Sequence, residues 1–237
     1  MTLPFKCERM SQPKAVFWDI GGVILNMQSV RAGHTAFVTT LLDEYDISTH
    51  PDEALSIWRD ELGAYFAETE GTNYRPAREG YRRAIRALAG TDDIDWEPLF
   101  RAVTTEQLEP NPGAVETIHR IAREPLHQGV ISDVDDEEGK QILDAFGVLE
   151  SMDSVTTSEA VGRKKPDAAM FETALKKAGV DPHHAVMIGD RYSHDMRGGR
   201  DAGMITVAYG AEDGPAVDYK IEKLREVLAI IGIDDDV

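Results

Sequence analysis

Short apolar runs of strand length recur along the chain. The first covers residues 15–18 and is followed directly by Asp19. The others lie at 127–133, 185–190 and 204–210, with a weaker candidate at 154–157. Buried strands of parallel sheets are continuous apolar runs, so each of these segments is predicted to form a strand.

Stretches with apolar residues at helical spacing separate these strands. They cover residues 112–123, 137–146, 167–178 and 195–202. Gly147 and Gly179 follow two of them, at a position where glycine commonly ends a helix. Strands that alternate with helices predict an α/β fold with a Rossmann-like, doubly wound parallel sheet.

The region from residue 28 to residue 107 breaks this alternation. It carries amphipathic helical patterns at 35–45, 51–68, 75–89 and 96–107, without strong strand candidates. The Pro- and Gly-containing segment 109–113 has the composition of a return linker. We therefore expect a helical domain at 28–107, inserted into a core formed by residues 1–27 and 108–237.

Composition narrows the range of partners. The 237-residue chain is 42% hydrophobic, which is enough for a sizeable core, and its net charge is -18. Such an acidic surface repels nucleic acid and anionic lipid, so we expect neither as a partner. Scarce lysine, with none between Lys14 and Lys140, together with the acidic surface suggests a salt-rich cytoplasm.

Two further features of the sequence bear on its location and redox chemistry. We see no membrane span and no apolar secretory segment at the start, so we expect a cytoplasmic protein. The single cysteine, Cys7, excludes an internal disulfide and a thiolate metal cluster. The oligomeric state cannot be read from these patterns.

Polar side chains stand at the ends of the predicted strands. Asp19 ends the first and is followed by Gly21 and Gly22, Ser132 ends the second, and Asp190 ends the fourth. Lys165 precedes the helix predicted at 167–178. Because the carboxyl ends of parallel strands meet at one edge of a sheet, these groups are expected to form a single site.

The residue types at this edge indicate phosphate chemistry. Asp19, Asp190 and Asp195 would repel one another unless a cation intervened, and Mg²⁺ prefers such oxygen ligands. Lys165, the Ser132 hydroxyl and glycine-rich backbone amides near Gly22 suit a phosphate group. The Asp133 amide is expected to donate as well, with its carboxylate turned away. A carboxylate nucleophile can form an acyl-phosphate that water cleaves.

In chain order, this set resembles the haloacid dehalogenase superfamily of hydrolases. The matching motifs are Asp19-Ile20-Gly21-Gly22-Val23, Ser132, Lys165-Pro166-Asp167, and Gly189-Asp190 with Asp195. The inserted helices match the position of the family's cap domain. The resemblance implies Mg²⁺-dependent hydrolysis of a small phosphorylated metabolite.

The resemblance also implies a role for each residue. Asp19 would be the nucleophile and a metal ligand, with Asp190 and the Gly21 carbonyl as further ligands. Asp195 would bind the metal or its waters, or else cap a helix. Ser132 and Lys165 would hold the phosphoryl group, and Lys165 would also restrain the charge of Asp19.

Gly21 departs from the family pattern. Most phosphatases of the family carry a second Asp there, which protonates the leaving group and then activates water. Loss of such a group costs on the order of 10²–10⁴ in rate. The absence of this Asp argues against a phosphomutase. In a phosphatase, a cap residue, a bound water or a substrate with a good leaving group would have to compensate for the missing acid–base group.

Two alternatives stay open. A metal-independent 2-haloacid dehalogenase would need an aromatic residue at the Gly21 position, which is missing, and a cap arginine for the halide. The other alternative is a non-catalytic module that binds a phosphorylated metabolite or a protein partner. The insert contains no lysine, which excludes Schiff-base phosphonate cleavage. Arg75, expected to open its helix, is the candidate to contact an anionic part of the substrate.

Overall fold

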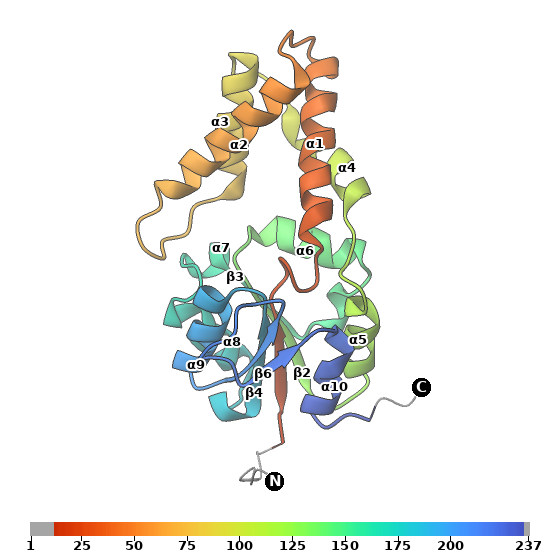
Figure 1. Cartoon of the computed structure of the whole chain (residues 1–237), viewed down its shortest axis with the longest axis vertical. Helices are drawn as coiled ribbons and strands as arrows, with labels where there is room; N and C mark the ends of the chain where they lie inside the picture. Colours follow the sequence, from red (N-terminus) through yellow and green to blue (C-terminus); the bar gives the residue numbers. More distant parts are fainter. Residues whose placement is uncertain (1–11, 235–237) are drawn as a thin grey trace.

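The computed structural model describes residues 12–234, so Cys7 lies outside the described residues. Its centre is a six-stranded sheet in the order β3-β2-β1-β4-β5-β6, in which every neighbouring pair is parallel (Figure 1). The strands are β1 (Ala15–Trp18), β2 (His127–Ser132), β3 (Ser154–Thr157), β4 (Ala185–Gly189), β5 (Ile205–Tyr209) and β6 (Tyr219–Ile221). The α/β prediction is confirmed, and β6 is an addition to it.

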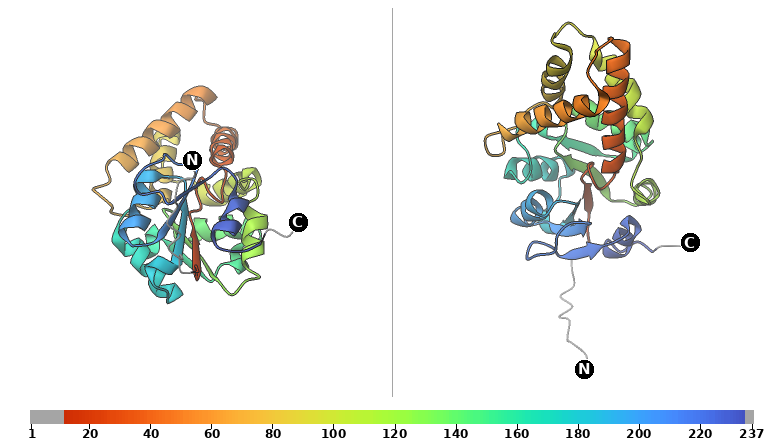
Figure 2. Two further views of the ribbon diagram at one scale, coloured as in Figure 1. Left: turned by 60° about the horizontal axis from the view of Figure 1, so that its bottom comes forward. Right: turned by 45° about the horizontal axis from the view of Figure 1, so that its top comes forward.

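Helices cover both faces of this sheet (Figure 2). The core helices are α5 (Ala114–Ile121), α6 (Asp136–Ala145), α7 (Ser158–Val161), α8 (Ala168–Ala178), α9 (Arg197–Asp201) and α10 (Val227–Ile230). Short turns of 3₁₀ helix form η1 (Leu149–Ser151), η2 (Pro182–His184) and η4 (Leu224–Glu226), and η3 (Tyr192–Met196) is a π-helical turn. Among the described residues, no helix has both the length and the apolar character that a membrane span requires.

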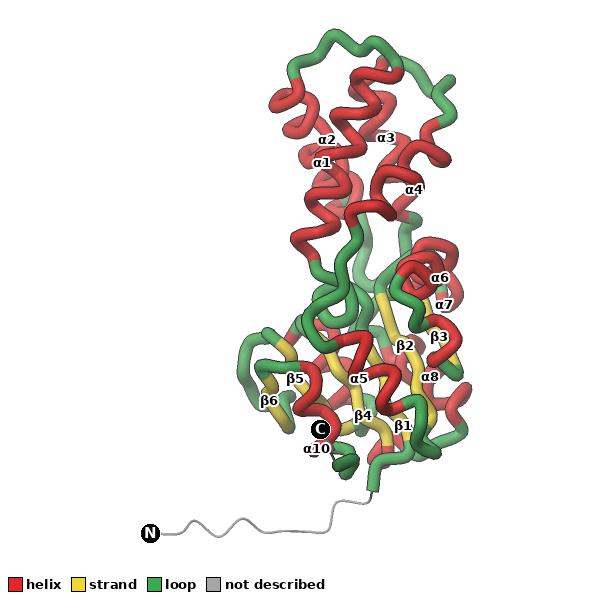
Figure 3. Tube along the Cα trace, turned by 90° about the vertical axis from the view of Figure 1, so that its right-hand side faces the viewer, coloured by secondary structure: helices red, strands yellow, loops and turns green. Residues whose placement is uncertain are grey.

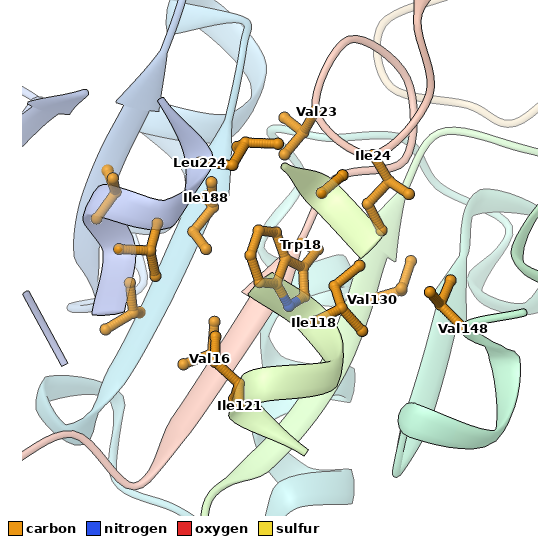
Figure 4. Packing of buried hydrophobic residues seen from close by; sticks show 14 of the residues in the cluster. Val16, Trp18, Val23, Ile24, Ile118, Ile121, Val130, Val148, Ile188 and Leu224 are labelled. Atoms are coloured by element: carbon orange, nitrogen blue, oxygen red, sulfur yellow. The ribbon is translucent and has the colours of Figure 1, made fainter. Parts of the chain in front are cut away.

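The central strand β1 shows how the two faces are filled. Val16 and Trp18 pack with residues of α5, α6 and α10, whereas Ala15 and Phe17 pack with α8 on the opposite face. This is the period-2 alternation of a strand. Figure 4 shows Trp18 among the side chains of α5, β2 and β4. Its indole N–H donates to Gln128 at 3.2 Å, so the buried polar atom is satisfied.

Helices α1 (Met27–Glu44), α2 (Pro51–Ala67), α3 (Ala77–Ala89) and α4 (Trp96–Gln107) form a helical lobe beyond the carboxyl ends of the strands (Figure 3). The lobe has a hydrophobic cluster of its own, built around Phe37, Trp58 and Tyr81. Helix α1 begins at Met27 rather than at residue 35. Its first turns include Gly33, where an added Cβ would lie 3.4 Å from the Thr104 backbone, so a small residue lets α1 and α4 pack closely.

The loop between α2 and α3 docks onto the core. The Thr72 hydroxyl donates to the Asp167 carboxylate at 2.7 Å, and the Thr72 carbonyl accepts from the Lys164 amide at 2.7 Å. The Tyr74 amide donates to the Gly162 carbonyl at 3.2 Å. These bonds join the lobe to the core loop that precedes α8.

Asp135, in the core just before α6, makes a second connection. Its carboxylate accepts from the Tyr74 hydroxyl at 2.7 Å and from the amides of Ala77 at 2.9 Å and Arg78 at 3.4 Å. The first amides of a helix lack intrahelical partners and carry partial positive charge. The residue before α3 is Pro76, whose side chain makes no cap bond. A core carboxylate therefore caps a helix of the lobe.

We predict that Asp135→Ala loosens the lobe from the core. Loss of a helix cap costs about 0.5–2 kcal/mol, and here the Tyr74 hydroxyl also loses its acceptor. Hydrogen exchange should speed up at the Ala77 and Arg78 amides. Asp144→Ala, an exposed change on α6, is the control. Unchanged protection of these two amides in Asp135→Ala would contradict the prediction.

Candidate active site

A buried lysine stands at the carboxyl edge of the sheet. The Lys165 ammonium lies 2.9 Å from Asp19 and 2.5 Å from Asp195, and it donates to the Ile131 carbonyl at 3.0 Å. Lys165 is 2% exposed, Asp19 is 6% exposed and Asp195 is fully covered. Burial by itself lowers the pKa of Lys165, but the two carboxylates outweigh it and raise that pKa above its ordinary value. The lysine is therefore held in its charged form.

Asp19 follows β1, and its contacts orient one carboxylate oxygen. Oδ1 accepts from the Ser132 hydroxyl at 2.7 Å and from the Ile20 amide at 2.8 Å, in addition to Lys165. Burial raises the pKa of Asp19 to about 7, with a further contribution from the Asp195 charge, although Lys165 and Ser132 oppose the shift. A single lysine therefore does not fully offset the cost of burying the Asp19 carboxylate beside Asp195.

Three carboxylates converge here, two from strand ends and Asp195 from η3. Oxygens of Asp19, Asp190 and Asp195 all lie within 4.8 Å of one another. Burial and the Asp195 charge raise the pKa of Asp190, and its Oδ1 is buried without a hydrogen-bond partner. An unpartnered buried oxygen among hard oxygen donors is the arrangement that Mg²⁺ fits.

Glycines make room for these carboxylates. Gly22 has φ +78°, and a Cβ there would lie 2.0 Å from the Asp190 carboxylate. A Cβ at Gly189 would lie 2.2 Å from the Asp195 side chain. Both positions need glycine because any larger residue would push the acids apart. Gly21 differs, since a Cβ there would meet only Met27 Sδ, at 3.5 Å.

Asp195 does not cap a helix. It lies within η3, and α9 begins after Met196 without a side-chain cap. Its Oδ2 accepts from the Arg191 amide at 2.9 Å, while Oδ1 faces Lys165. Asp195 therefore positions the lysine and the turn that follows β4.

Asp133 holds the loop that carries Lys165. Its Oδ1 accepts from the Lys165 amide at 2.8 Å and from the Ser158 hydroxyl at 3.0 Å. The carboxylate thus has a structural partner on the core. Together with Ser132, this places two consecutive residues at the end of β2 around the same lysine and aspartate.

A cleft of about 480 Å³ opens between the core and the lobe. Gly21, Ser132 and Asp133 line it from the core, and side chains of α1, α3 and α4 line it from the lobe. The cleft therefore brings a substrate against the edge of the sheet where Asp19 lies.

Arg75 also lines the cleft, but it is engaged within the lobe. It precedes α3, rather than opening it as predicted. Its guanidinium donates to the Tyr65 carbonyl at 2.5 Å and to Glu68 at 3.2 Å, and it stacks 3.9 Å above the Tyr65 ring. These contacts occupy the group that was expected to reach an anionic substrate.

Sequence reasoning missed Glu138, which also lines the cleft. It accepts from the Tyr81 hydroxyl at 3.4 Å, and burial and the nearby Asp135 raise its pKa to about 7. It lies in an acidic run, 135–138, whose pattern is that of a solvated helix start. Only the lobe above α6 makes this position enclosed.

His34, on α1, lies among aromatic rings of the lobe. Burial lowers its pKa to about 4, so the ring is neutral near pH 7. The Trp58 indole N–H donates to its Nδ1 at 3.4 Å. His34 thus lines the cleft as part of an aromatic wall.

Comparison with known proteins identifies the family. A sequence model of the haloacid dehalogenase-like hydrolases matches residues 13–203, which is most of the chain. The chain is a haloacid dehalogenase-like hydrolase. It is 30% identical over 226 residues to a glyceraldehyde 3-phosphate phosphatase from Methanocaldococcus jannaschii, covering 92% of this chain and 96% of that one.

Solved structures of this hydrolase family share the fold. A haloacid dehalogenase (HAD) family phosphatase from Thermococcus onnurineus has a TM-score of 0.72 and 24% identity, covering 92% of this chain and 98% of that chain. A 2-haloacid dehalogenase from Pseudomonas syringae has a TM-score of 0.69 and 21% identity, covering 93% of this chain and 98% of that chain. Because both reactions occur on this fold, the site must discriminate between them.

We predict that Glu138→Gln changes how stability depends on pH. A folded-state pKa of about 7, above the ordinary value of 4.5, means that the folded state holds the proton more tightly. This stabilisation is present below pH 4.5 and is lost as pH rises to 7, by at most about 3 kcal/mol. The stability advantage of Glu138→Gln over the parent protein should therefore grow across this range and level off above it. Chemical unfolding from pH 4.5 to 8 measures this, and a constant difference would contradict it.

Proposed function

We propose that the protein is a Mg²⁺-dependent phosphomonoester hydrolase that forms an aspartyl-phosphate on Asp19. The observation that carries this proposal is the Asp19 carboxylate, held by Lys165 and Ser132 beside Asp190 and Asp195. The phosphatase relative supports the same reaction class. The substrate is a small phosphorylated metabolite.

In this proposal, the two oxygens of Asp19 have different roles. Lys165, Ser132 and the Ile20 amide all contact Oδ1, which leaves Oδ2 to attack phosphorus. As the Oδ2–P bond forms, the bond from phosphorus to the leaving oxygen breaks, and that oxygen takes a proton from water. Water then cleaves the acyl-phosphate and regenerates the Asp19 carboxylate.

The neighbouring groups stabilise charge on the phosphoryl oxygens. Lys165 supplies a buried positive charge, and the Ser132 hydroxyl and the amides near Gly22 and Asp133 supply donors. Asp19, Asp190, Asp195 and the Gly21 carbonyl would hold Mg²⁺, which neutralises phosphoryl oxygens when bound. The helical lobe, residues 28–107, acts as a cap domain that excludes bulk water from the cleft.

The site favours this reaction over the two alternatives. A dehalogenase needs no metal, so the carboxylate cluster with its unpartnered oxygen would be a cost without a purpose. Gly21 supplies no aromatic side chain, and Arg75 is paired with Glu68. A non-catalytic role has only Gly21 in its favour.

The acidic surface should make the stability of the protein depend on salt concentration. We propose that the protein works in a salt-rich cytoplasm, because screening relieves the repulsion of a -18 net charge. Its unfolding temperature should rise between dilute buffer and molar KCl. Equal stability in both would contradict this setting.

We predict that Asp19→Asn abolishes phosphatase activity while preserving the fold. An amide oxygen is too weak a nucleophile to form the phospho-enzyme, and the loss should exceed about 10³-fold. Hydrolysis of p-nitrophenyl phosphate with Mg²⁺ in molar KCl, together with circular dichroism, measures both. Asp144→Asn should retain activity, and persistent turnover by Asp19→Asn would rule out the mechanism. Metal-independent chloride release from chloroacetate would instead support a dehalogenase.

We predict that Asp190→Asn raises stability in chelator but removes the stabilisation by Mg²⁺. The substitution relieves carboxylate repulsion and deletes one ligand. For the parent protein, Mg²⁺ at a hundredfold excess over Kd should raise the unfolding temperature by about 5–10 °C. Thermal unfolding with and without Mg²⁺ measures this. An equal Mg²⁺ shift in Asp190→Asn would show that the ion binds elsewhere.

A further inference from the structure

The part of the cleft contributed by the lobe is aromatic. His34, Tyr81, Trp96 and Phe100 line it. The Tyr81 and Phe100 ring centroids lie 4.5 Å apart, and those of His34 and Tyr81 lie 5.6 Å apart. Since His34 is neutral near pH 7, this wall carries no cation. Such rings attract a flat, apolar group more strongly than a hydroxylated one.

The arginines of the cleft are already matched with acids. Arg75 lies 3.2 Å from Glu68, Arg78 lies 3.8 Å from Glu159, and Arg101 lies 3.8 Å from Glu137. Lys164 also lines the cleft, and comes from the core loop that carries Lys165. On the lobe side, the charges are therefore paired, which suits an uncharged leaving group.

Gly21 lines the same cleft and offers no proton to a departing oxygen. The backbone does not require glycine here: its φ lies outside the left-handed region, and a Cβ would make only an ordinary contact with Met27. An oxygen that leaves without a proton must itself be a weak base. Phenols such as tyrosine have a pKa near 10, whereas water has a pKa of about 15.7. A departing phenolate is therefore a much weaker base than hydroxide.

We propose that the cleft selects phosphomonoesters of phenols or similarly acidic aromatic hydroxyl compounds. The ring lies against Tyr81 and Phe100 while the phosphate reaches Asp19. The P–O(aryl) bond breaks as the Asp19 Oδ2–P bond forms, its electron pair leaves on the aryl oxygen, and the phenolate takes its proton from water. This inference rests on the phosphatase function proposed above.

Inhibition by unreactive analogues tests the selection of the ring, because aryl esters are intrinsically more reactive than alkyl esters. Phenylphosphonate should inhibit at least about tenfold more tightly than propylphosphonate. Phe100→Leu should remove most of this preference, whereas Tyr45→Leu, a change of another lobe aromatic that does not line the cleft, should keep it. Equal inhibition of the parent protein by the two phosphonates would overturn the proposal.

A series of substituted phenyl phosphates, with glycerol 3-phosphate and glyceraldehyde 3-phosphate beside them, tests the leaving group. In the parent protein, kcat/KM should fall steeply as the pKa of the leaving hydroxyl rises. Gly21→Asp should flatten this dependence and raise turnover of the alkyl esters by about 10²–10⁴-fold. Glu138→Gln should leave the slope unchanged, and a steeper slope would assign the missing acid to Glu138 and overturn the proposal.

The outcomes separate this inference from the function on which it rests. Efficient hydrolysis of both alkyl esters by the parent protein, lost in Asp19→Asn, would overturn the aryl preference and leave the phosphatase function standing. Absence of turnover for every ester, in molar KCl with Mg²⁺, would overturn both.

Discussion

The contact between Lys165 and the carboxylates of Asp19 and Asp195 is the interaction on which the rest of the site depends. Burying a charge costs several kcal/mol unless partners compensate, so a buried lysine must be delivered to a defined place. Asp133 holds its backbone, Ile131 accepts from its ammonium, and the two carboxylates keep it charged. The same contacts leave an excess of negative charge around Asp190, which explains why the site suits a divalent cation.

The segment after β2 serves both the core and the lobe. Ser132, the last residue of β2, and Asp133 contact Asp19 and the Lys165 loop, whereas Asp135 caps α3 and Glu138 contacts Tyr81. The loop before α8 is shared in the same way, because it carries Lys165 and is also hydrogen-bonded to Thr72 through Lys164 and Asp167. The position of the lobe is therefore tied to the residues that surround Asp19. A movement of the lobe would act directly on these two loops.

Positions 21 and 22, which follow Asp19 and Ile20, are occupied by glycine for different physical reasons. Gly22 is required by its backbone conformation and by the closeness of the Asp190 carboxylate. Gly21 has room for a side chain, so its lack of one concerns chemistry rather than packing. A cleft with an aromatic wall and paired arginines gives that lack a meaning, because the weakly basic oxygen of an aryl leaving group can depart without a general acid. The two features come from distant parts of the chain and point to the same kind of substrate.

The sequence by itself determined the α/β core and the strand ends that carry Asp19, Ser132 and Asp190, because continuous apolar runs and parallel topology dictate both. It missed β6, whose three residues are too short to give a pattern, and the first turns of α1, whose Gly33 hides the helical signal. Only the tertiary structure decided that Asp135 caps α3, that Glu138 is enclosed and that Arg75 is engaged with Tyr65 and Glu68. The first two contacts join residues more than fifty positions apart, and that of Arg75 joins the segment before α3 to Tyr65 near the end of α2. Local periodicity records which face of an element is buried, but not which partner covers it.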